Sequence, residues 1–155
     1  MNILSSGCNV ETSANEHCMP STVLWINRIA LFLIYFLFGF LKIISSSPAE
    51  QLIAHLHRMT LGAFVSIDKF LIILGAAECL IGILWLIPKL TKYALVIFLI
   101  QIATTFLPLV ILPEDTWRDT LVLSLTGQYI FKNIVLIACA LTIYKDCQVR
   151  GWKFL

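Results

Sequence analysis

Four long apolar stretches dominate this 155-residue chain, and each is long enough to cross a lipid bilayer as a helix. They run, in chain order, from about Val23 to Ile44, Phe70 to Ile87, Tyr93 to Leu112 and Leu121 to Tyr144. Only 13% of the residues are charged, whereas soluble domains carry about 25%. The sequence therefore predicts an all-α membrane protein, a four-transmembrane-helix bundle, with the lipid bilayer as its first partner. The net charge of +2 provides no basic surface for nucleic acid.

The segments outside the four stretches divide the chain further. Residues 1–20 are predicted to be a flexible polar N-terminal tail, residues 21–147 the membrane domain, and residues 148–155 a cytoplasmic C-terminal tail. Between the first two spans, Ser47 and Pro48 are typical of a helix start. The short amphipathic helix that follows is predicted to lie along the outer membrane face.

Two further local signals fall outside the spans or near their ends. His55 and His57 are two positions apart on the interfacial helix, so they should point to different sides and not form a metal-ligand pair. Pro108 should kink or weaken the third span near its outer end. We expect an exposed acidic loop from Pro113 to about Thr120.

Lysine and arginine positions predict the orientation. Lys89 and Lys92 lie in the short turn between the second and third spans, and Lys145, Arg150 and Lys153 follow the fourth. Because cytoplasmic loops are enriched in these residues, both termini are predicted to be cytoplasmic.

Glu78 is the one charged residue in the stretch from Phe70 to Ile87. A charge at the bilayer centre costs about 2.5–3.5 kcal/mol on insertion scales, so it should have a partner. When the spans are aligned by depth, Gln101, Lys132 and Asn133 fall at the same level. The sequence predicts that Glu78 pairs with Lys132, on a helix face where Gly75, Cys79 and Gly82 allow close approach.

The first span contributes a second polar face. Arg28, Tyr35, Gly39 and Lys42 share one side of the helix, although Arg28 and Lys42 could each extend to their nearer interface instead. The predicted ligand pocket opens outward and is lined by Tyr35, Lys42, Glu78, Gln101, Gln128, Lys132 and Asn133. The alternative is a buried polar network that only fixes which helices pair.

Several motifs together resemble the DoxX-like superfamily of four-helix membrane proteins, most closely its YkgB-like branch. The motifs are FLFGFLKI with Gly39 and Lys42, LGAAECLIGILWLIP with Glu78 and Gly82, and LTGQYIFKNIVLIACAL with Gly127, Lys132 and Asn133. The resemblance implies four helices and a bacterial inner-membrane location. It also implies a link to quinone-dependent sulfur oxidation or to oxidative stress, without supplying a catalytic residue. The family often has Asp where this chain has Asn133.

Two functions are consistent with these observations. In the first, the chain is an accessory redox subunit, not a self-contained enzyme, and it holds a quinone whose polar head meets Lys132, Glu78 and Gln101. The sequence has no haem, flavin or iron–sulfur motif and no CxxC, so electrons would come from a redox partner protein or from Cys79 and Cys139. In the second, it is a non-enzymatic scaffold or resistance factor with a structural ion pair. Neither reading assigns a metal site, and the oligomeric state stays open.

Overall fold

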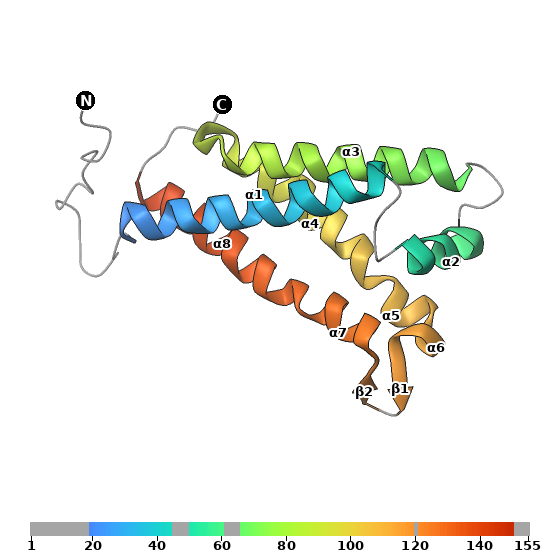
Figure 1. Cartoon of the computed structure of the whole chain (residues 1–155). Coiled ribbons are helices and arrows are strands. Elements are labelled where there is room, and N and C mark those ends of the chain that lie inside the picture. Colours follow the sequence, from blue (N-terminus) through green and yellow to red (C-terminus); the bar gives the residue numbers. More distant parts are fainter. Residues whose placement is uncertain (1–18, 45–49, 61–65, 120, 151–155) are drawn as a thin grey trace.

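The chain folds as a set of long helices in a computed structural model that describes residues 19–44, 50–60, 66–119 and 121–150. Figure 1 shows α1 and α3 side by side, while α4 and the α7–α8 pair run obliquely to them. The helices are α1 (Ser21–Ile43), α2 (Glu50–Thr60), α3 (Ile67–Trp85), η1 (Pro88–Leu90), α4 (Thr91–Phe106), α5 (Pro108–Ile111), α6 (Pro113–Thr116), α7 (Leu125–Phe131) and α8 (Asn133–Val149). The predicted capping residues Ser47 and Pro48 lie outside the described residues.

Within the described ranges, three segments are long and apolar enough to cross a membrane: Ser21–Ile43, Pro88–Ile111 and Leu125–Val149. These segments correspond to the first, third and fourth predicted spans. A mostly helical chain with helices long and apolar enough to cross a membrane is therefore confirmed. That α3, the second predicted span, also crosses the membrane stays a prediction.

The third and fourth spans differ in detail from the expected ones. Pro108 interrupts the third span as predicted, since α4 ends at Phe106 and α5 begins at Pro108. The segment from Pro113 to Asp119 is mostly exposed, as predicted, but it is not a loop. It contains α6 and β1 (Trp117–Asp119), which pairs antiparallel with β2 (Val122–Leu123) just beyond it.

The fourth span begins later and ends later than predicted. Its start is set by Ser124, whose hydroxyl oxygen accepts a bond from the backbone N–H of Gly127 at 3.1 Å and so caps α7. Its end reaches Val149, because Asp146 and Cys147, which lie beyond the predicted last residue Tyr144, are buried against the bundle.

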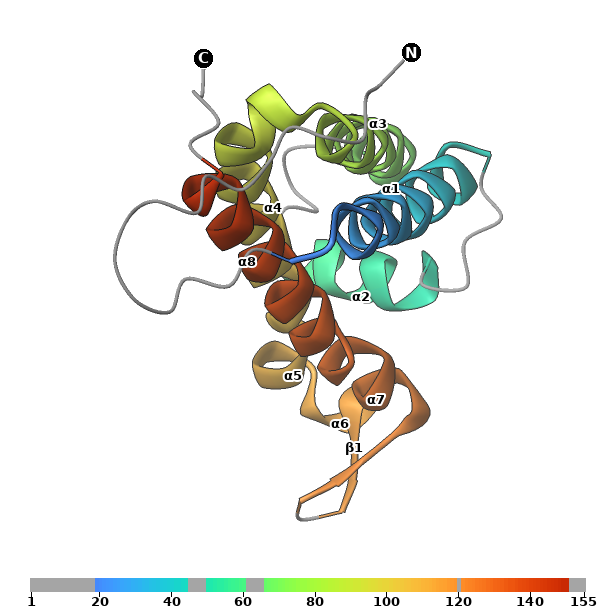
Figure 2. The ribbon, with the colours of Figure 1, turned by 90° about the vertical axis from the view of Figure 1, so that its left-hand side faces the viewer.

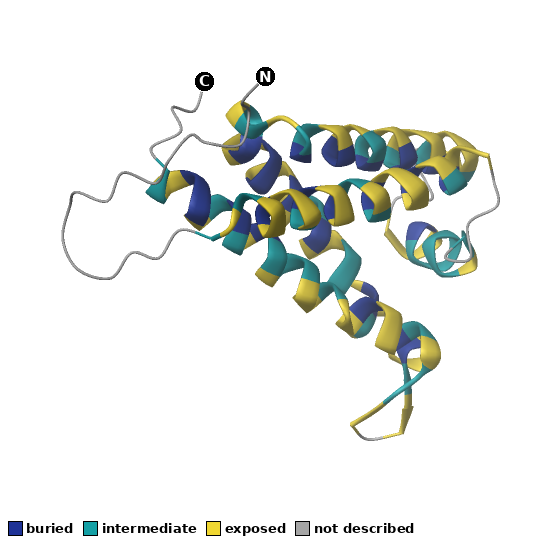
Figure 3. Ribbon diagram, turned by 60° about the vertical axis from the view of Figure 1, so that its left-hand side comes forward, coloured by how far each residue is buried: buried dark blue, intermediate teal, exposed yellow. Residues whose placement is uncertain are grey.

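The core lies where α1, α3, α4 and α8 meet (Figures 2 and 3). Leu31, Trp85, Phe98 and Ile143 are fully buried there, with the ring of Trp85 edge-on to that of Phe98. The outward faces are apolar too: Ile26, Ile73 and Ile100 are each more than half exposed. Apolar side chains on both the inner and outer faces are typical of helices surrounded by lipid.

Two glycines allow α1 and α3 to approach closely, as the small residues of the second span predicted. A Cβ atom added at Gly39 would lie 2.6 Å from the carbonyl oxygen of Gly75, and the reverse distance is also 2.6 Å. Because no side chain fits at either position, the backbones of the two helices are in direct contact.

Replacing Gly75 by valine should separate the two helices. We expect Gly75→Val to lower the free energy of unfolding by about 1–3 kcal/mol, as overpacking does elsewhere. Unfolding of the purified protein in mixed micelles, followed by tryptophan fluorescence, measures this. The matched control is Ala76→Val at the next, exposed position. Equal effects of the two substitutions would show that the contact is not close.

Candidate functional site

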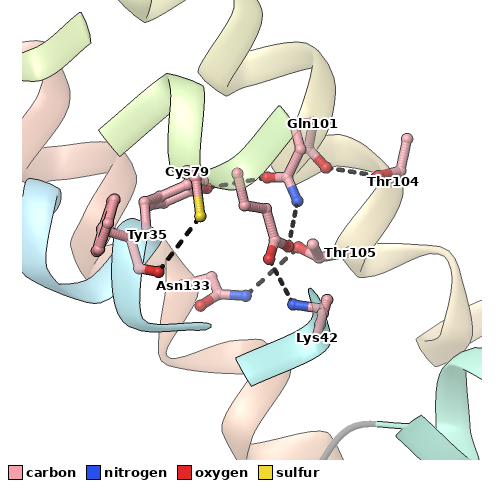
Figure 4. A network of polar contacts seen from close by, with 9 residues as sticks. Tyr35, Lys42, Cys79, Gln101, Thr104, Thr105 and Asn133 are labelled. Atoms are coloured by element: carbon pink, nitrogen blue, oxygen red, sulfur yellow. Dashed lines mark hydrogen bonds and ion pairs between the residues drawn. The ribbon is translucent and has the colours of Figure 1, made fainter. Parts of the chain in front are cut away.

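Four of the predicted polar residues meet where α1, α3 and α4 come together (Figure 4). Tyr35 and Lys42 come from α1, Glu78 from α3 and Gln101 from α4. Tyr35, Lys42 and Glu78 are buried, with 6–7% of each residue exposed, and Gln101 is half-buried. These residues form one connected group, which we call the Glu78 network.

The Glu78 network is a chain of hydrogen bonds. The Lys42 ammonium donates to Glu78 Oε2 at 2.5 Å, and the Gln101 amide Nε2 donates to Glu78 Oε1 at 3.0 Å. The Tyr35 hydroxyl in turn donates to the Gln101 carbonyl Oε1 at 3.0 Å. Both carboxylate oxygens therefore have a donor, and Gln101 uses both ends of its amide.

Helix geometry explains why Lys42 reaches Glu78. Each residue lies three positions after the glycine of its own helix, Gly39 on α1 and Gly75 on α3. Because the two helices are antiparallel and helical side chains lean toward the N-terminus, Lys42 and Glu78 lean toward each other at the glycine contact. The close backbone approach thus provides the proximity that a buried ion pair requires.

The prediction that Lys132 is the partner of Glu78 is wrong. Lys132 is exposed, at the junction of α7 and α8, and its ammonium lies 4.4 Å from the ring centroid of Tyr129 and 5.6 Å from that of Phe38. The prediction assumed that the spans run parallel, so that residues at the same depth in the membrane would be neighbours. Instead, α7 and α8 run obliquely to α1 and α3 (Figure 1). Equal depth therefore did not give contact.

Two other predicted pocket residues also lie apart from the Glu78 network. Gln128 is exposed, and its amide donates to the backbone oxygen of Leu123 at 3.4 Å. The Asn133 amide donates to the hydroxyl of Thr105 on α4 at 3.4 Å. Asn133 therefore joins α8 to α4 but does not contact Glu78 within hydrogen-bond distance.

A second polar cluster, which the sequence did not predict, surrounds Arg28 at the other end of α1. The guanidinium is fully buried and donates to the backbone oxygen of Trp85 at 2.7 Å, to the Thr91 hydroxyl at 2.8 Å and to the Cys147 sulfur at 2.9 Å. One side chain thus connects α1 to α3, α4 and α8. The available signal was that Arg28 shares a helix face with Tyr35 and Lys42.

The short helix α2 contacts the bundle through its two histidines. Nδ1 of His55 lies 2.6 Å from Oδ2 of Asp115 on α6, and both side chains are about 40% exposed. His57 is buried, with its ring centroid 5.1 Å from that of Phe70 on α3. The histidines point to different sides, as predicted, and hold α2 against two separate elements.

The Lys42 ammonium in the Glu78 network has hydrogen-bonding capacity beyond its bond to Glu78, counted over the described residues. A lysine ammonium has three N–H donors, and among the described residues that of Lys42 has one acceptor, Glu78. The network can therefore offer a positive donor to an acceptor oxygen from outside the three helices.

Comparison of the chain with protein-family models, curated proteins and solved structures finds no match, so the DoxX-like resemblance stays a prediction.

Breaking the Lys42–Glu78 pair on one side should be worse than removing both charges. We expect Lys42→Met or Glu78→Gln alone to lower the free energy of unfolding by about 3–5 kcal/mol, because each leaves a buried charge unpaired. The double variant should recover much of that loss, as a mutant cycle in mixed micelles measures. Lys132→Met is the control. If Lys132→Met couples to Glu78→Gln and Lys42→Met does not, the pairing is incorrect.

Arg28 should not tolerate even lysine. An ammonium cannot reach three acceptors on different helices as a planar guanidinium does, so Arg28→Lys should lower the free energy of unfolding by about 1–3 kcal/mol. Arg118→Lys on the exposed β1 strand is the matched control, with little change expected. The same unfolding experiment compares them, and a tolerated Arg28→Lys would contradict the multiple contacts.

Proposed function

We propose that the chain is a four-span integral membrane protein and that α3 is the remaining span. The ends of the bundle support an even number of crossings. The Met19 backbone N–H, just before α1, donates to Asp146 Oδ1 near the end of α8 at 2.8 Å, and Arg150 contacts the Met19 carbonyl oxygen. The start of the first span and the end of the last span therefore lie on the same side of the membrane. Three crossings would place them on opposite sides.

The composition of α3 is consistent with this role. Its 19 residues extend about 28 Å, close to the thickness of the hydrocarbon core. Asp68 and Lys69 lie in its exposed first turn, at the membrane surface, and its one deeper charge, Glu78, is paired. With Lys89 and Lys92 exposed at its other end, the positive-inside rule orients both termini toward the cytoplasm of a bacterial inner membrane.

Within this topology, we propose that the Glu78 network binds the polar head of a lipophilic carbonyl compound such as a quinone. The observation that carries this proposal is the buried Lys42 ammonium, for which the described residues provide one acceptor. A quinone carbonyl is an acceptor without a donor, so it matches the remaining N–H groups of Lys42 and does not compete for Glu78. The Tyr35 hydroxyl belongs to the same network through its bond to Gln101.

The protein would serve as an accessory subunit of a membrane redox or stress-response system. Lys42 would bind a quinone carbonyl and stabilise negative charge on its oxygen, and Glu78 would hold the ammonium in position. Electrons would be exchanged by a redox partner protein. The resemblance to DoxX-like proteins, which include a subunit of a thiosulfate:quinone oxidoreductase, favours this role.

A structural role for the same residues is the second candidate. It is favoured by the observation that both oxygens of Glu78 already have donors, from Lys42 and Gln101. In that case, the network only fixes how α1, α3 and α4 pack, and the protein is a non-enzymatic scaffold or resistance factor.

Quinone binding separates the two candidates. Protein purified in mild detergent should contain quinone in its organic extract, and added ubiquinone or menaquinone analogues should raise its thermal midpoint. The Lys42→Met,Glu78→Gln double variant should lose both effects while staying folded, because its donor is absent. Lys69→Gln, an exposed lysine of α3, is the control. Wild-type protein without quinone and without a thermal shift would leave the structural role.

A further inference from the structure

Lys132 places a positive charge on an apolar surface. Its side chain is exposed, and its neighbours along the helix are exposed as well: Tyr129 is 64% exposed, Phe131 53% and Val135 68%. The ammonium lies over the rings of Tyr129 and of Phe38 from α1. The position is thus an exposed cation between an aromatic ring of α1 and one of α7.

The described residues around Lys132 attract its charge but do not neutralise it. Among the residues that the structure describes, the ion pairs join Lys42 to Glu78, His55 to Asp115 and Arg150 to Asp146, and Lys132 is in none of them. Aromatic rings stabilise a cation through their quadrupole and carry no net charge. A lysine inside an apolar span without a carboxylate therefore requires a negative group from elsewhere.

The depth of Lys132 is compatible with a lipid phosphate. The segment Leu125–Val149 has 25 residues and extends about 37 Å, roughly 7 Å more than the hydrocarbon core. Lys132 follows Leu125 by seven residues, or about 10 Å along the axis. Because part of the excess length lies outside the hydrocarbon, and because lysine side chains extend toward the interface, the ammonium can reach the headgroup layer.

We propose that Lys132, with Tyr129 and Phe38, is a binding site for the phosphate group of an anionic phospholipid. The lipid would come from the leaflet on the α7 side, opposite the termini. The ammonium would pair with the phosphate, the Tyr129 hydroxyl would provide a second donor, and the acyl chains would lie along the exposed apolar side chains of α7 and α8. This site is separate from the Glu78 network and does not depend on quinone binding there.

Native mass spectrometry of the full chain in detergent tests the site. Titration with phosphatidylglycerol should give stronger lipid adducts than titration with phosphatidylcholine, whose headgroup has no net charge. Lys132→Gln should weaken phosphatidylglycerol binding by about fivefold, the contribution of one lysine near an anionic membrane surface. Lys132→Arg should retain binding. Lys69→Gln is the matched control. Lys69 is an exposed lysine at the start of α3, which the proposed topology places on the same side of the membrane as Lys132, and this variant should bind phosphatidylglycerol as the wild type does.

Several results would overturn the proposal. Equal binding of the two lipids by the wild type would show that charge is not recognised, and unchanged phosphatidylglycerol binding by Lys132→Gln would place the lipid elsewhere. A change in oligomeric mass of Lys132→Gln without a change in lipid binding would assign Lys132 to a contact between copies. Should Lys132→Gln not fold, Tyr129→Leu keeps the charge, removes the ring and the hydroxyl, and is expected to weaken the phosphatidylglycerol adduct by a smaller factor.

Discussion

The pairing of a buried ammonium with a buried carboxylate depends on a backbone contact that only glycine permits. Lys42 and Glu78 can meet because Gly39 and Gly75 bring α1 and α3 into direct contact one turn away. In an apolar environment, an unpaired charge is far more costly than a paired one, so this geometry fixes the axial position of α1 on α3. Gln101 and Tyr35 then extend the same constraint to α4.

A buried cation fixes each end of α1 against the other helices, a guanidinium at one end and an ammonium at the other. Near the N-terminal end of α1, the Arg28 guanidinium contacts α3, α4 and α8. Toward the opposite end, Lys42 contacts α3, with the packed rings of Tyr35, Trp85 and Phe98 between the two clusters. Apolar packing alone gives little preference for one helix rotation when lipid is also apolar. The two polar clusters therefore specify how α1 is rotated against its neighbours, and the apolar core packs between them.

Sequence reasoning identified the faces of helices better than the contacts between them. The polar face of α1, the small face of α3 and the break at Pro108 follow from local spacing and chemistry, and the structure has all three. The partner of Glu78 and the contacts of Arg28 depend on how helices cross, which no local pattern encodes. The β1–β2 hairpin was missed because its strands have three and two residues, too short for a periodic signal.

Lys42 and Glu78 differ in how many of their hydrogen-bonding sites are already used. This difference determines which kind of ligand could bind beside them. Glu78 accepts one hydrogen bond on each oxygen, from Lys42 and from Gln101, so about half of its lone-pair sites are already used. Among the described residues, Lys42 uses one of its three N–H donors, so a ligand oxygen can be added there without breaking a bond. The carboxylate then has a positioning role, because it keeps the ammonium buried and oriented. This asymmetry favours acceptor ligands such as carbonyl compounds over cationic ones at the Glu78 network.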